Sequence, residues 1–197
     1  MHLPVNRREQ ILDAAEELLR RYGIEKTNIV DVAKALGLSH TAVYKYFPTK
    51  IAVQEAVAAR WLNRITQPMA DIAASPSGAE QTLRRWLTSL VDLKRRKARE
   101  DCELFQVYNA LVESAEGAVA HHMDQLTRQL VHIIEHGNET GEFRVRDSRQ
   151  AAQAVLNATV RFHHPYFLSK GDAQQPTEAE SRKVVDLLLG GLKTGNV

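Results

Sequence analysis

The sequence predicts an all-α protein of about nine helices. Apolar residues recur three and four positions apart along most of the 197-residue chain, which is the spacing of one face of a helix. No stretch alternates apolar and polar residues for long enough to indicate a strand. Residues 28–50 add a third observation, because two short amphipathic helices joined by a glycine turn are expected there. The N-terminal part is therefore predicted to be a three-helix unit of the helix-turn-helix type.

The helix-turn-helix is predicted to follow an amphipathic helix at residues 7–22. Asn28 caps the first of its two helices and Gly37 ends it, because glycine accepts the left-handed conformation found after a helix. Ser39 is a second capping residue and begins the second helix, at 39–46. These signals predict a compact pair of helices with a tight turn.

The second helix of the pair has two faces. Val43 and Phe47, four residues apart, can pack against the first helix. The other face offers hydrogen-bond donors, an aromatic hydroxyl and positive charge, and no acidic residue lies between Leu38 and Lys50. A helix in the DNA major groove needs such groups, because short polar side chains reach base edges while Tyr and Lys hold phosphates. An ordinary helical hairpin with a solvated face would show the same pattern.

A set of residues in this region resembles the TetR (tetracycline-repressor-like) family of bacterial regulators in both order and spacing. The resemblance covers about residues 7–60, and the remainder is similar only as a helical domain of the right length. It implies a DNA-binding transcriptional regulator. The residues that carry it are Gly23, Thr27, Val32-Ala33, Gly37-Leu38-Ser39, Ala42-Val43-Tyr44, Tyr46-Phe47-Pro48 and Lys50.

Polar residues of the motif are expected to contact DNA in three ways. Short side chains at the start of the second helix would read base edges, tyrosine hydroxyls and lysines would hold phosphates, and the start of the first helix would present backbone N–H groups to a phosphate. The base contacts are assigned to His40 and Thr41 with Ser39 beside them, the phosphate contacts to Tyr44, Tyr46 and Lys50, either role to Lys45, and the N–H groups to Thr27 and Asn28.

The resemblance and the helical spacing together predict two domains. A DNA-binding domain is expected at 1–48 and an effector-binding and dimerisation domain at 49–197, with a helix at 49–74 connecting the two. The segment Ala-Ser-Pro-Ser-Gly at 74–78 is the clearest break in the chain. The basic run at 94–99 is expected to be a solvated face. Further helices are expected at 79–99, 101–114, 117–139, 148–163 and 178–193.

Composition is that of an ordinary globular protein, with 44% hydrophobic and 25% charged residues and a net charge of +2. No apolar run approaches the roughly 20 residues of a membrane span. The first residues lack the apolar run of a signal peptide, so a cytoplasmic protein is expected. One cysteine, Cys102, excludes an internal disulfide. Since no phosphate-binding glycine loop, nucleophile elbow or paired-cysteine metal site is present, neither enzymatic activity nor a cofactor is expected.

Histidines of the C-terminal region are the only chemically suggestive set. His132 and His136 lie four apart, which is a metal-ligand spacing, but Glu135 between them does not follow the zincin order and no third ligand is evident. Half-buried or surface histidines would give the same pattern, so no metal site is assigned. The whole set is His121, His122, His132, His136, His163 and His164.

A pocket for an apolar or aromatic small molecule is expected between the middle helices of the C-terminal region. Each candidate could equally be an ordinary core residue. The resemblance also implies a homodimer, in which helices 148–163 and 178–193 pair with those of a second subunit and Gly190-Gly191 allows close approach. The pocket candidates are Trp86, Phe105, Tyr108, Asn109, Phe162, His163 and Tyr166.

The sequence is therefore interpreted as a homodimeric, ligand-responsive transcriptional regulator, with repression the commoner mode of the family. It is expected to bind a palindromic operator in double-stranded DNA and to be released by a small-molecule effector. An effector can act in this way only if it binds one conformational state more tightly than the other. Two alternatives stay open: a metal-sensing regulator that uses the C-terminal histidines, and a helical enzyme or interaction module that does not bind DNA.

Overall fold

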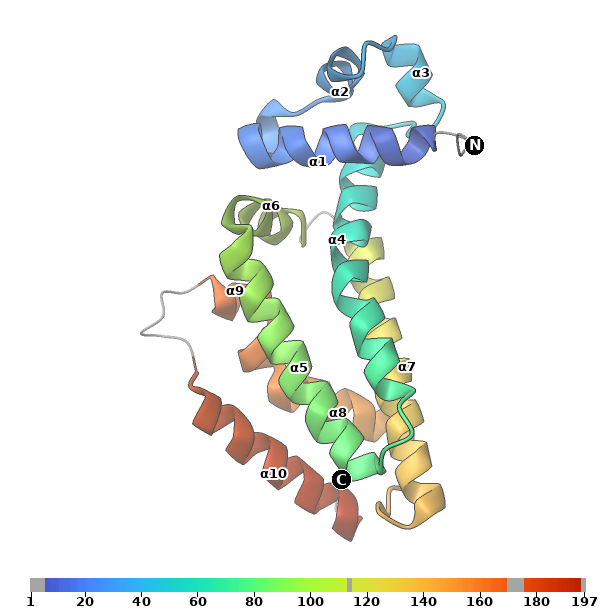
Figure 1. The fold of residues 1–197 in the computed structure, drawn as a ribbon, viewed down its shortest axis with the longest axis vertical. Coiled ribbons are helices and arrows are strands. Elements are labelled where there is room, and N and C mark those ends of the chain that lie inside the picture. Colours follow the sequence, from blue (N-terminus) through green and yellow to red (C-terminus); the bar gives the residue numbers. More distant parts are fainter. Residues whose placement is uncertain (1–5, 113–114, 170–175, 196–197) are drawn as a thin grey trace. The chain divides into compact units, whose positions relative to one another are not determined.

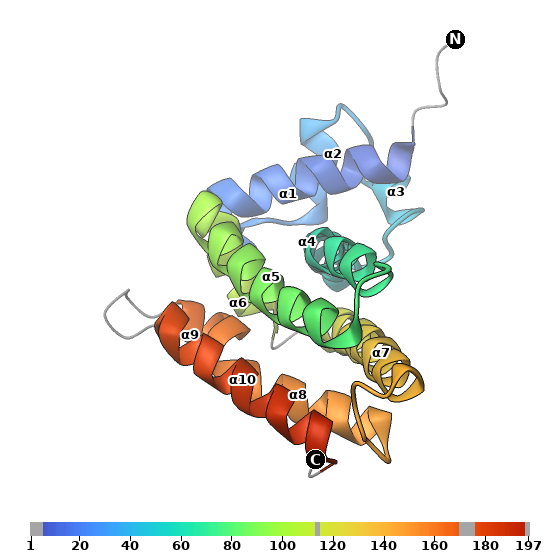
Figure 2. The same ribbon diagram turned by 60° about the horizontal axis from the view of Figure 1, so that its bottom comes forward.

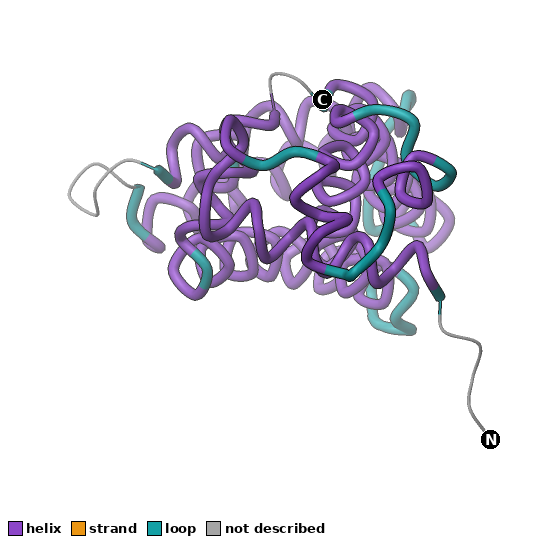
Figure 3. The backbone as a smooth tube through the Cα atoms, turned by 90° about the horizontal axis from the view of Figure 1, so that it is seen from above, coloured by secondary structure: helices purple, strands orange, loops and turns teal. Residues whose placement is uncertain are grey.

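The structure is a computed structural model that describes residues 6–112, 115–169 and 176–195. Within these ranges all regular structure is helical, and the tube in Figure 3 runs as helix or loop throughout. The all-α prediction is confirmed. The helices, labelled in Figure 1, are α1 (Arg7–Lys26), α2 (Ile29–Ala35), α3 (His40–Tyr44), α4 (Lys50–Ala73), α5 (Ala79–Glu100), α6 (Cys102–Val112), α7 (Glu116–Thr140), α8 (Ser148–His163), α9 (Pro165–Leu168) and α10 (Glu178–Thr194).

The helix that the sequence did not predict is the short α9. No helix was expected between residues 163 and 178, but Pro165 begins a new helical turn there. Proline suits this position because its fixed φ matches a helix and its missing N–H has no partner to lose there. His164 caps the turn, with its Nδ1 accepting a hydrogen bond from the Tyr166 N–H at 3.2 Å.

The chain divides into two compact units, each described here by itself. The first contains residues 1–62 and 101–120, and the second contains residues 63–100 and 121–197. The first unit therefore includes α6 together with the helix-turn-helix. The predicted functional boundary after residue 48 remains a prediction.

Helix α1 of the first unit is broken where the sequence predicted its end. Gly23 has φ of 75° and ψ of 179°, and one further turn carries the helix to Lys26. The positive φ is a conformation that glycine adopts without the steric cost of a Cβ atom. The Thr27 hydroxyl closes the break by donating to the Gly23 carbonyl oxygen at 2.8 Å.

Both helices of the helix-turn-helix begin with the predicted caps. The Asn28 side chain accepts from the Asp31 N–H at 3.0 Å, and the Asp31 carboxylate accepts in return from the Asn28 N–H at 3.2 Å. Ser39 Oγ accepts from the Ala42 N–H at 3.2 Å. Gly37 has φ of 64° in the turn between the two helices. The pair is thus held by local hydrogen bonds that short polar side chains provide.

Helices α1, α4 and α6 complete the first unit. α1 packs against both α2 and α6. Trp61 of α4 stacks on Tyr108 of α6, with ring centroids 4.1 Å apart. Arg60 of α4 pairs with Asp13 at 2.6 Å and with the buried Glu16 of α1. An aromatic stack and an ion-pair network therefore join the three helices.

The second unit is built on α5, α7, α8 and α10. Figure 2 shows α10 running beside α5 and α8, and these helices pack on one another. Its core includes fully buried apolar residues of α5 and α7 such as Trp86, Leu90 and Leu130. Glu142 caps α5, because its carboxylate accepts hydrogen bonds from the Glu80 and Ala79 N–H groups, each at 2.9 Å. The bond from Glu80, followed by the bond from Ala79, lowers the pKa of the Glu142 carboxyl. Among the residues described, no helix combines the length and apolar character needed to cross a bilayer.

Candidate DNA-reading surface and effector site

Helix α3 carries the residues predicted to read DNA, and its two faces are as the sequence indicated. Val43 is fully buried and Phe47 is 3% exposed, so both belong to the core of the unit. The opposite face is exposed, and Tyr44 and Tyr46 keep 44% and 45% of their surface accessible. The other exposed candidates of this segment are Ser39, His40, Thr41 and Lys45.

The regular part of α3 is shorter than predicted, ending at Tyr44 rather than residue 46. The chain continues in tight turns, because the N–H groups of Tyr46 and Phe47 both donate to the Val43 carbonyl oxygen at 3.0 Å. His40 and Tyr44 sit on the same side of the helix, with their rings edge to face and centroids 6.4 Å apart. His40, a predicted base contact, and Tyr44, a predicted phosphate contact, are thus neighbours, and each ring restricts the orientation of the other.

Three predicted phosphate contacts are engaged within the protein. The Asn28 N–H donates to Asp31, and the Thr27 side chain is buried and bonded to Gly23. The Lys50 Nζ donates to the Glu25 carbonyl oxygen at 3.3 Å and so links the start of α4 to the end of α1. Each of these residues holds the helix-turn-helix in shape, and the sequence pattern alone could not separate that role from a phosphate contact.

Arginines of α1 add positive charge to the same unit. Arg7 and Arg8 are exposed, and the Arg8 guanidinium lies 5.1 Å from the centroid of the Phe47 ring. The cation and the ring attract each other at this separation, which holds Arg8 beside the segment that follows α3. The arrangement can supply cations to a phosphate backbone next to the reading helix.

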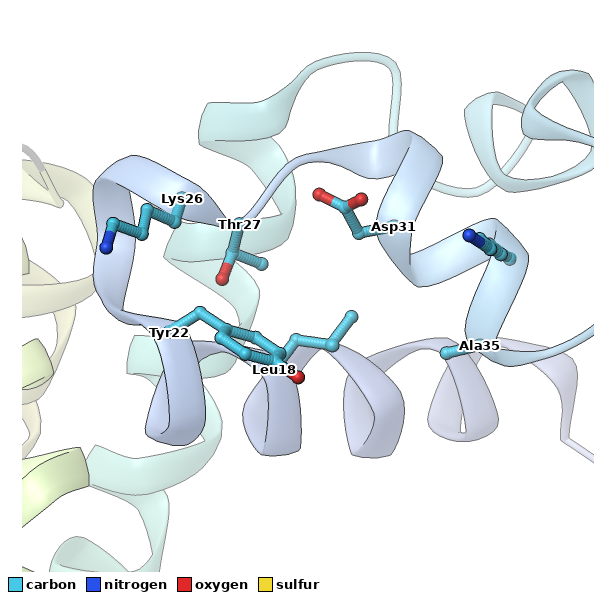
Figure 4. Close-up of a pocket in the computed structure, with 7 residues that line it drawn as sticks. Leu18, Tyr22, Lys26, Thr27, Asp31 and Ala35 are labelled. Atoms are coloured by element: carbon cyan, nitrogen blue, oxygen red, sulfur yellow. The ribbon is translucent and has the colours of Figure 1, made fainter.

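An open hollow of about 550 Å³ lies between α1 and α2. Figure 4 shows Thr27 and Asp31 facing Leu18 and Tyr22 across it, with Lys26 at one side. The sequence did not indicate this hollow, since its walls come from two helices that only the fold brings together. It belongs to the first unit and is separate from the C-terminal residues predicted to bind an effector.

The predicted effector residues fall into both units. In the first unit, Phe105 and Tyr108 are buried, and burial raises the pKa of the Tyr108 hydroxyl. The Asn109 Oδ1 atom is also buried and has no hydrogen-bond partner among the described residues. In the second, Trp86 is fully buried and donates from Nε1 to Gln129 Oε1 at 3.0 Å. The remaining candidates of the second unit are Phe162 and His163, which are buried, and Tyr166, which is 58% exposed.

A buried polar cluster in the second unit was largely missed by the sequence reading. It consists of Lys94 on α5, His122 on α7 and His163 on α8, which are 5%, 2% and 3% exposed. The expectation of a solvated face over 94–99 is wrong for Lys94. Lys94 follows Leu90 by four residues on the apolar face of α5, and that spacing is the signal that could have revealed its burial.

The histidines of this cluster are held in their neutral form. Burial, with a smaller contribution from the charge of Lys94, lowers the pKa of His122 to about 2 and that of His163 to about 3. His122 Nδ1 is hydrogen-bonded to Thr66 Oγ1 at 2.7 Å, whereas its buried Nε2 has no partner in the described structure. His163 Nε2 lies 3.3 Å from Thr159 Oγ1. Burial lowers the pKa of Lys94 to about 8, so its ammonium remains charged at neutral pH.

The histidines considered as metal ligands do not form a metal site in the described part of the chain. No group of three or more His, Cys, Asp or Glu side chains there is placed to hold an ion. His132 and His136 lie beside a hollow near the turn after α4, together with Ser75 and Thr82.

Comparison with known sequences identifies two family domains in this chain. Residues 11–57 match the family described as bacterial regulatory proteins, tetR family. Residues 79–185 match the family described as tetracyclin repressor-like, C-terminal domain. No protein with curated annotation matches the chain.

Solved structures share the fold over nearly the whole chain. The fatty acid degradation regulator FadR from Bacillus halodurans is 22% identical, with a TM-score of 0.67 and coverage of 98% of this chain and 99% of that one. The regulator PfmR from Thermus thermophilus is 26% identical, with a TM-score of 0.56 and coverage of 92% and 98%. SmeT, the repressor of the Stenotrophomonas maltophilia multidrug efflux pump SmeDEF, is 18% identical, with a TM-score of 0.69 and coverage of 95% and 90%.

Proposed function

The chain belongs to the TetR family of DNA-binding transcriptional regulators, which are not enzymes, and from this premise we propose that it is a ligand-responsive repressor. It binds a near-palindromic operator as a homodimer and leaves the operator when a small molecule binds the second unit. The observation that carries the proposal is that α3 buries its apolar face in the protein and exposes its polar face to solvent.

The operator contacts follow from the exposed residues of α3. His40 and Thr41 lie in its first turn, where side chains of a helix in the major groove reach base edges. Tyr44, Tyr46 and Lys45 lie beside them and hold phosphates, with Lys45 also within the reach of bases. Because α3 is short, a single copy reads only a few base pairs, and two copies are needed for a specific site.

Dimerisation through α8 and α10 is supported by the apolar side chains that these helices expose to solvent. Leu187 of α10 is 75% exposed and Val160 of α8 is 38% exposed. Gly190 has nothing within 4 Å of the position of a Cβ atom, so a second backbone can approach there. A two-fold dimer would bind operator half-sites whose centres lie roughly 34–36 Å apart, or a multiple of that distance.

One solved structure with this fold supports a response to a small molecule, and another supports repression. RolR, 16% identical with a TM-score of 0.60, has been solved in complex with its ligand resorcinol. SmeT is a repressor. We extend ligand binding and repression from these proteins to this chain. The proposed effector favours a geometry of the dimer in which the two α3 helices no longer match the operator.

Selection of bound sequences from random duplex DNA tests the proposal. The expected result is an enriched palindrome, and scrambled DNA bound equally well at ~150 mM salt would contradict it, because low salt inflates nonspecific phosphate binding. A protein purified with its effector would also fail to enrich a sequence. The selection is therefore repeated after the protein has been unfolded and refolded to remove any ligand.

A further inference from the structure

Lys94 is a buried cation without an acidic partner. Its side chain is 5% exposed, and no carboxylate in the described ranges forms an ion pair with it. Taking an ammonium out of water is costly unless a counter-charge or hydrogen bonds replace the lost hydration. Proteins leave few such groups without compensation, so an unpaired buried lysine points to a charge that arrives from outside.

The surroundings of Lys94 are polar and also incomplete. His122 and His163, from α7 and α8, are close enough for the lysine charge to lower the pKa of both. The His122 Nε2 is buried and unpartnered, and so is the Oε1 atom of Gln125, one turn further along α7. Three helices of the second unit thus contribute to one polar cluster, in which the described residues supply no carboxylate for Lys94 and no hydrogen-bond partner for His122 Nε2.

Resting on the proposal that the second unit binds an effector, we propose that Lys94, His122 and His163 form the anion-binding end of that site, and that the effector is a small-molecule carboxylate. The Lys94 ammonium donates to the carboxylate oxygens. In this arrangement His122 adopts the tautomer in which Nδ1 accepts from the Thr66 hydroxyl and the proton is on Nε2, so that Nε2–H supplies a second donor.

Charge balance selects a carboxylate over a phosphate. At pH 7 the cluster contains one cation, Lys94, because both histidines are neutral there. A single carboxylate neutralises that charge. A phosphate dianion would leave a buried negative charge unless a histidine also took up a proton.

The test compares the purified protein with Lys94→Met, in the absence of DNA. Straight-chain and aromatic carboxylates are each paired with the primary alcohol of the same skeleton, and binding is followed by melting temperature and calorimetry. Lys97→Met is the matched control, since it removes a lysine three residues further along α5, where the side chain is 32% exposed. The expected result is that one or more carboxylates bind the native protein and Lys97→Met, while their alcohols do not.

The proposal is decided by how Lys94→Met differs from the native protein in carboxylate affinity and in melting temperature. The variant should bind the same carboxylate roughly 30-fold or more weakly, as expected for loss of a buried charged partner. It should also melt at the same or a higher temperature without ligand, because an apolar side chain of similar length replaces an uncompensated charge. A lysine with a purely structural role would instead make Lys94→Met less stable. Unchanged carboxylate binding by the variant, or equal binding of acids and alcohols, or no binding by any carboxylate, would overturn the proposal.

Operator binding separates this inference from the proposed function. If a carboxylate binds in a Lys94-dependent way and leaves operator affinity unchanged, the anion site stands and the ligand-responsive function fails. If only uncharged compounds release the operator, the function stands and the anion site is wrong.

Discussion

Arg20 of α1 makes a two-pronged ion pair with Asp101, the residue that precedes α6. Arg20 Nε donates to Asp101 Oδ1 at 3.1 Å and Nη2 donates to Oδ2 at 2.7 Å. The pair joins residues 81 positions apart within the first unit. Helix α5 ends at Glu100, so Asp101 is the next residue in the chain, and the ion pair anchors this point of the chain to α1.

Asp101→Asn should weaken the response to an effector more than it weakens operator binding. The pair is partly exposed, at 31% for Arg20 and 26% for Asp101, so its loss should cost about 1 kcal/mol of unfolding free energy. Operator affinity is measured by fluorescence anisotropy with and without effector. Glu17→Gln is the control, since Glu17 also pairs with Arg20, at 2.9 Å, but lies on α1 itself. Equal loss of response in both variants would contradict the role of Asp101.

Tyr44 and His40 should affect DNA binding in different ways. Tyr44→Phe removes one hydroxyl from an exposed phosphate contact and should weaken binding to operator and scrambled DNA alike, by roughly 3–10-fold. His40→Ala should instead relax the preference at particular base pairs, by about 1–3 kcal/mol for each base it reads. Parallel selections with each variant measure both effects. Equal losses on specific and random DNA for His40→Ala would show that it does not read bases.

The two substitutions should also be non-additive. The His40 and Tyr44 rings touch edge to face, so removing one leaves the other less well oriented. Affinities of the two single variants and the double variant give this coupling directly. Strict additivity would indicate that the contact has no part in DNA binding.

Leu187→Glu should separate the dimer without unfolding the chain. Leu187 is 75% exposed in the single chain, so a charge there costs little until a second subunit covers it. Mass measured by light scattering should fall to that of one chain, while helical circular dichroism is retained. Tyr166→Glu adds the same charge at another exposed residue, 58% accessible, and should remain dimeric. Dimers of Leu187→Glu would exclude this face of α10 from the interface.

Stability should fall as the pH is lowered from 6.5 to 5. The pKa of His122 and of His163 lies well below the ordinary value of 6.5, so in this range the unfolded chain binds protons that the folded chain does not. Each histidine then contributes at most about 1.4 kcal/mol per pH unit to the loss of unfolding free energy. Lys94 and His164, which influence or adjoin these histidines, do not reverse this sign, because burial lowers the pKa of both and disfavours their cationic forms.

His122→Asn should reduce this pH dependence. Asparagine can keep a hydrogen bond to Thr66 and does not titrate. Unfolding by urea at pH 7 and at pH 5 measures the change. His121→Asn is the matched control, because it removes the neighbouring histidine, whose side chain is exposed. An unchanged slope in His122→Asn would mean that this histidine is not held neutral.

Much of the fold was predictable because its signals are local. Asn28, Ser39 and Gly23 act on the backbone within a few residues of themselves, so the starts of α2 and α3 and the break in α1 could be predicted from the sequence. The short α9 was missed because a proline after a helix signals both an interruption and a new first turn.

The candidate effector site was less predictable because it depends on which helices pack together. The basic run at 94–99 gave no reason to separate Lys94 from its exposed neighbours, although its spacing from Leu90 placed it on the buried face. His122 was considered only as one of several histidines, and its burial follows from tertiary packing. Likewise, the engagement of Lys50 with the Glu25 carbonyl depends on a contact across 25 residues of sequence.

The most direct test of the central claim is the affinity of the enriched palindrome compared with a version in which one half is scrambled, titrated at ~150 mM salt, where nonspecific phosphate binding is suppressed. The full palindrome should bind two chains together and far more tightly than the half-scrambled duplex, because each copy of α3 reads one half-site. Equal affinity for both duplexes, or saturation by a single chain, would contradict it.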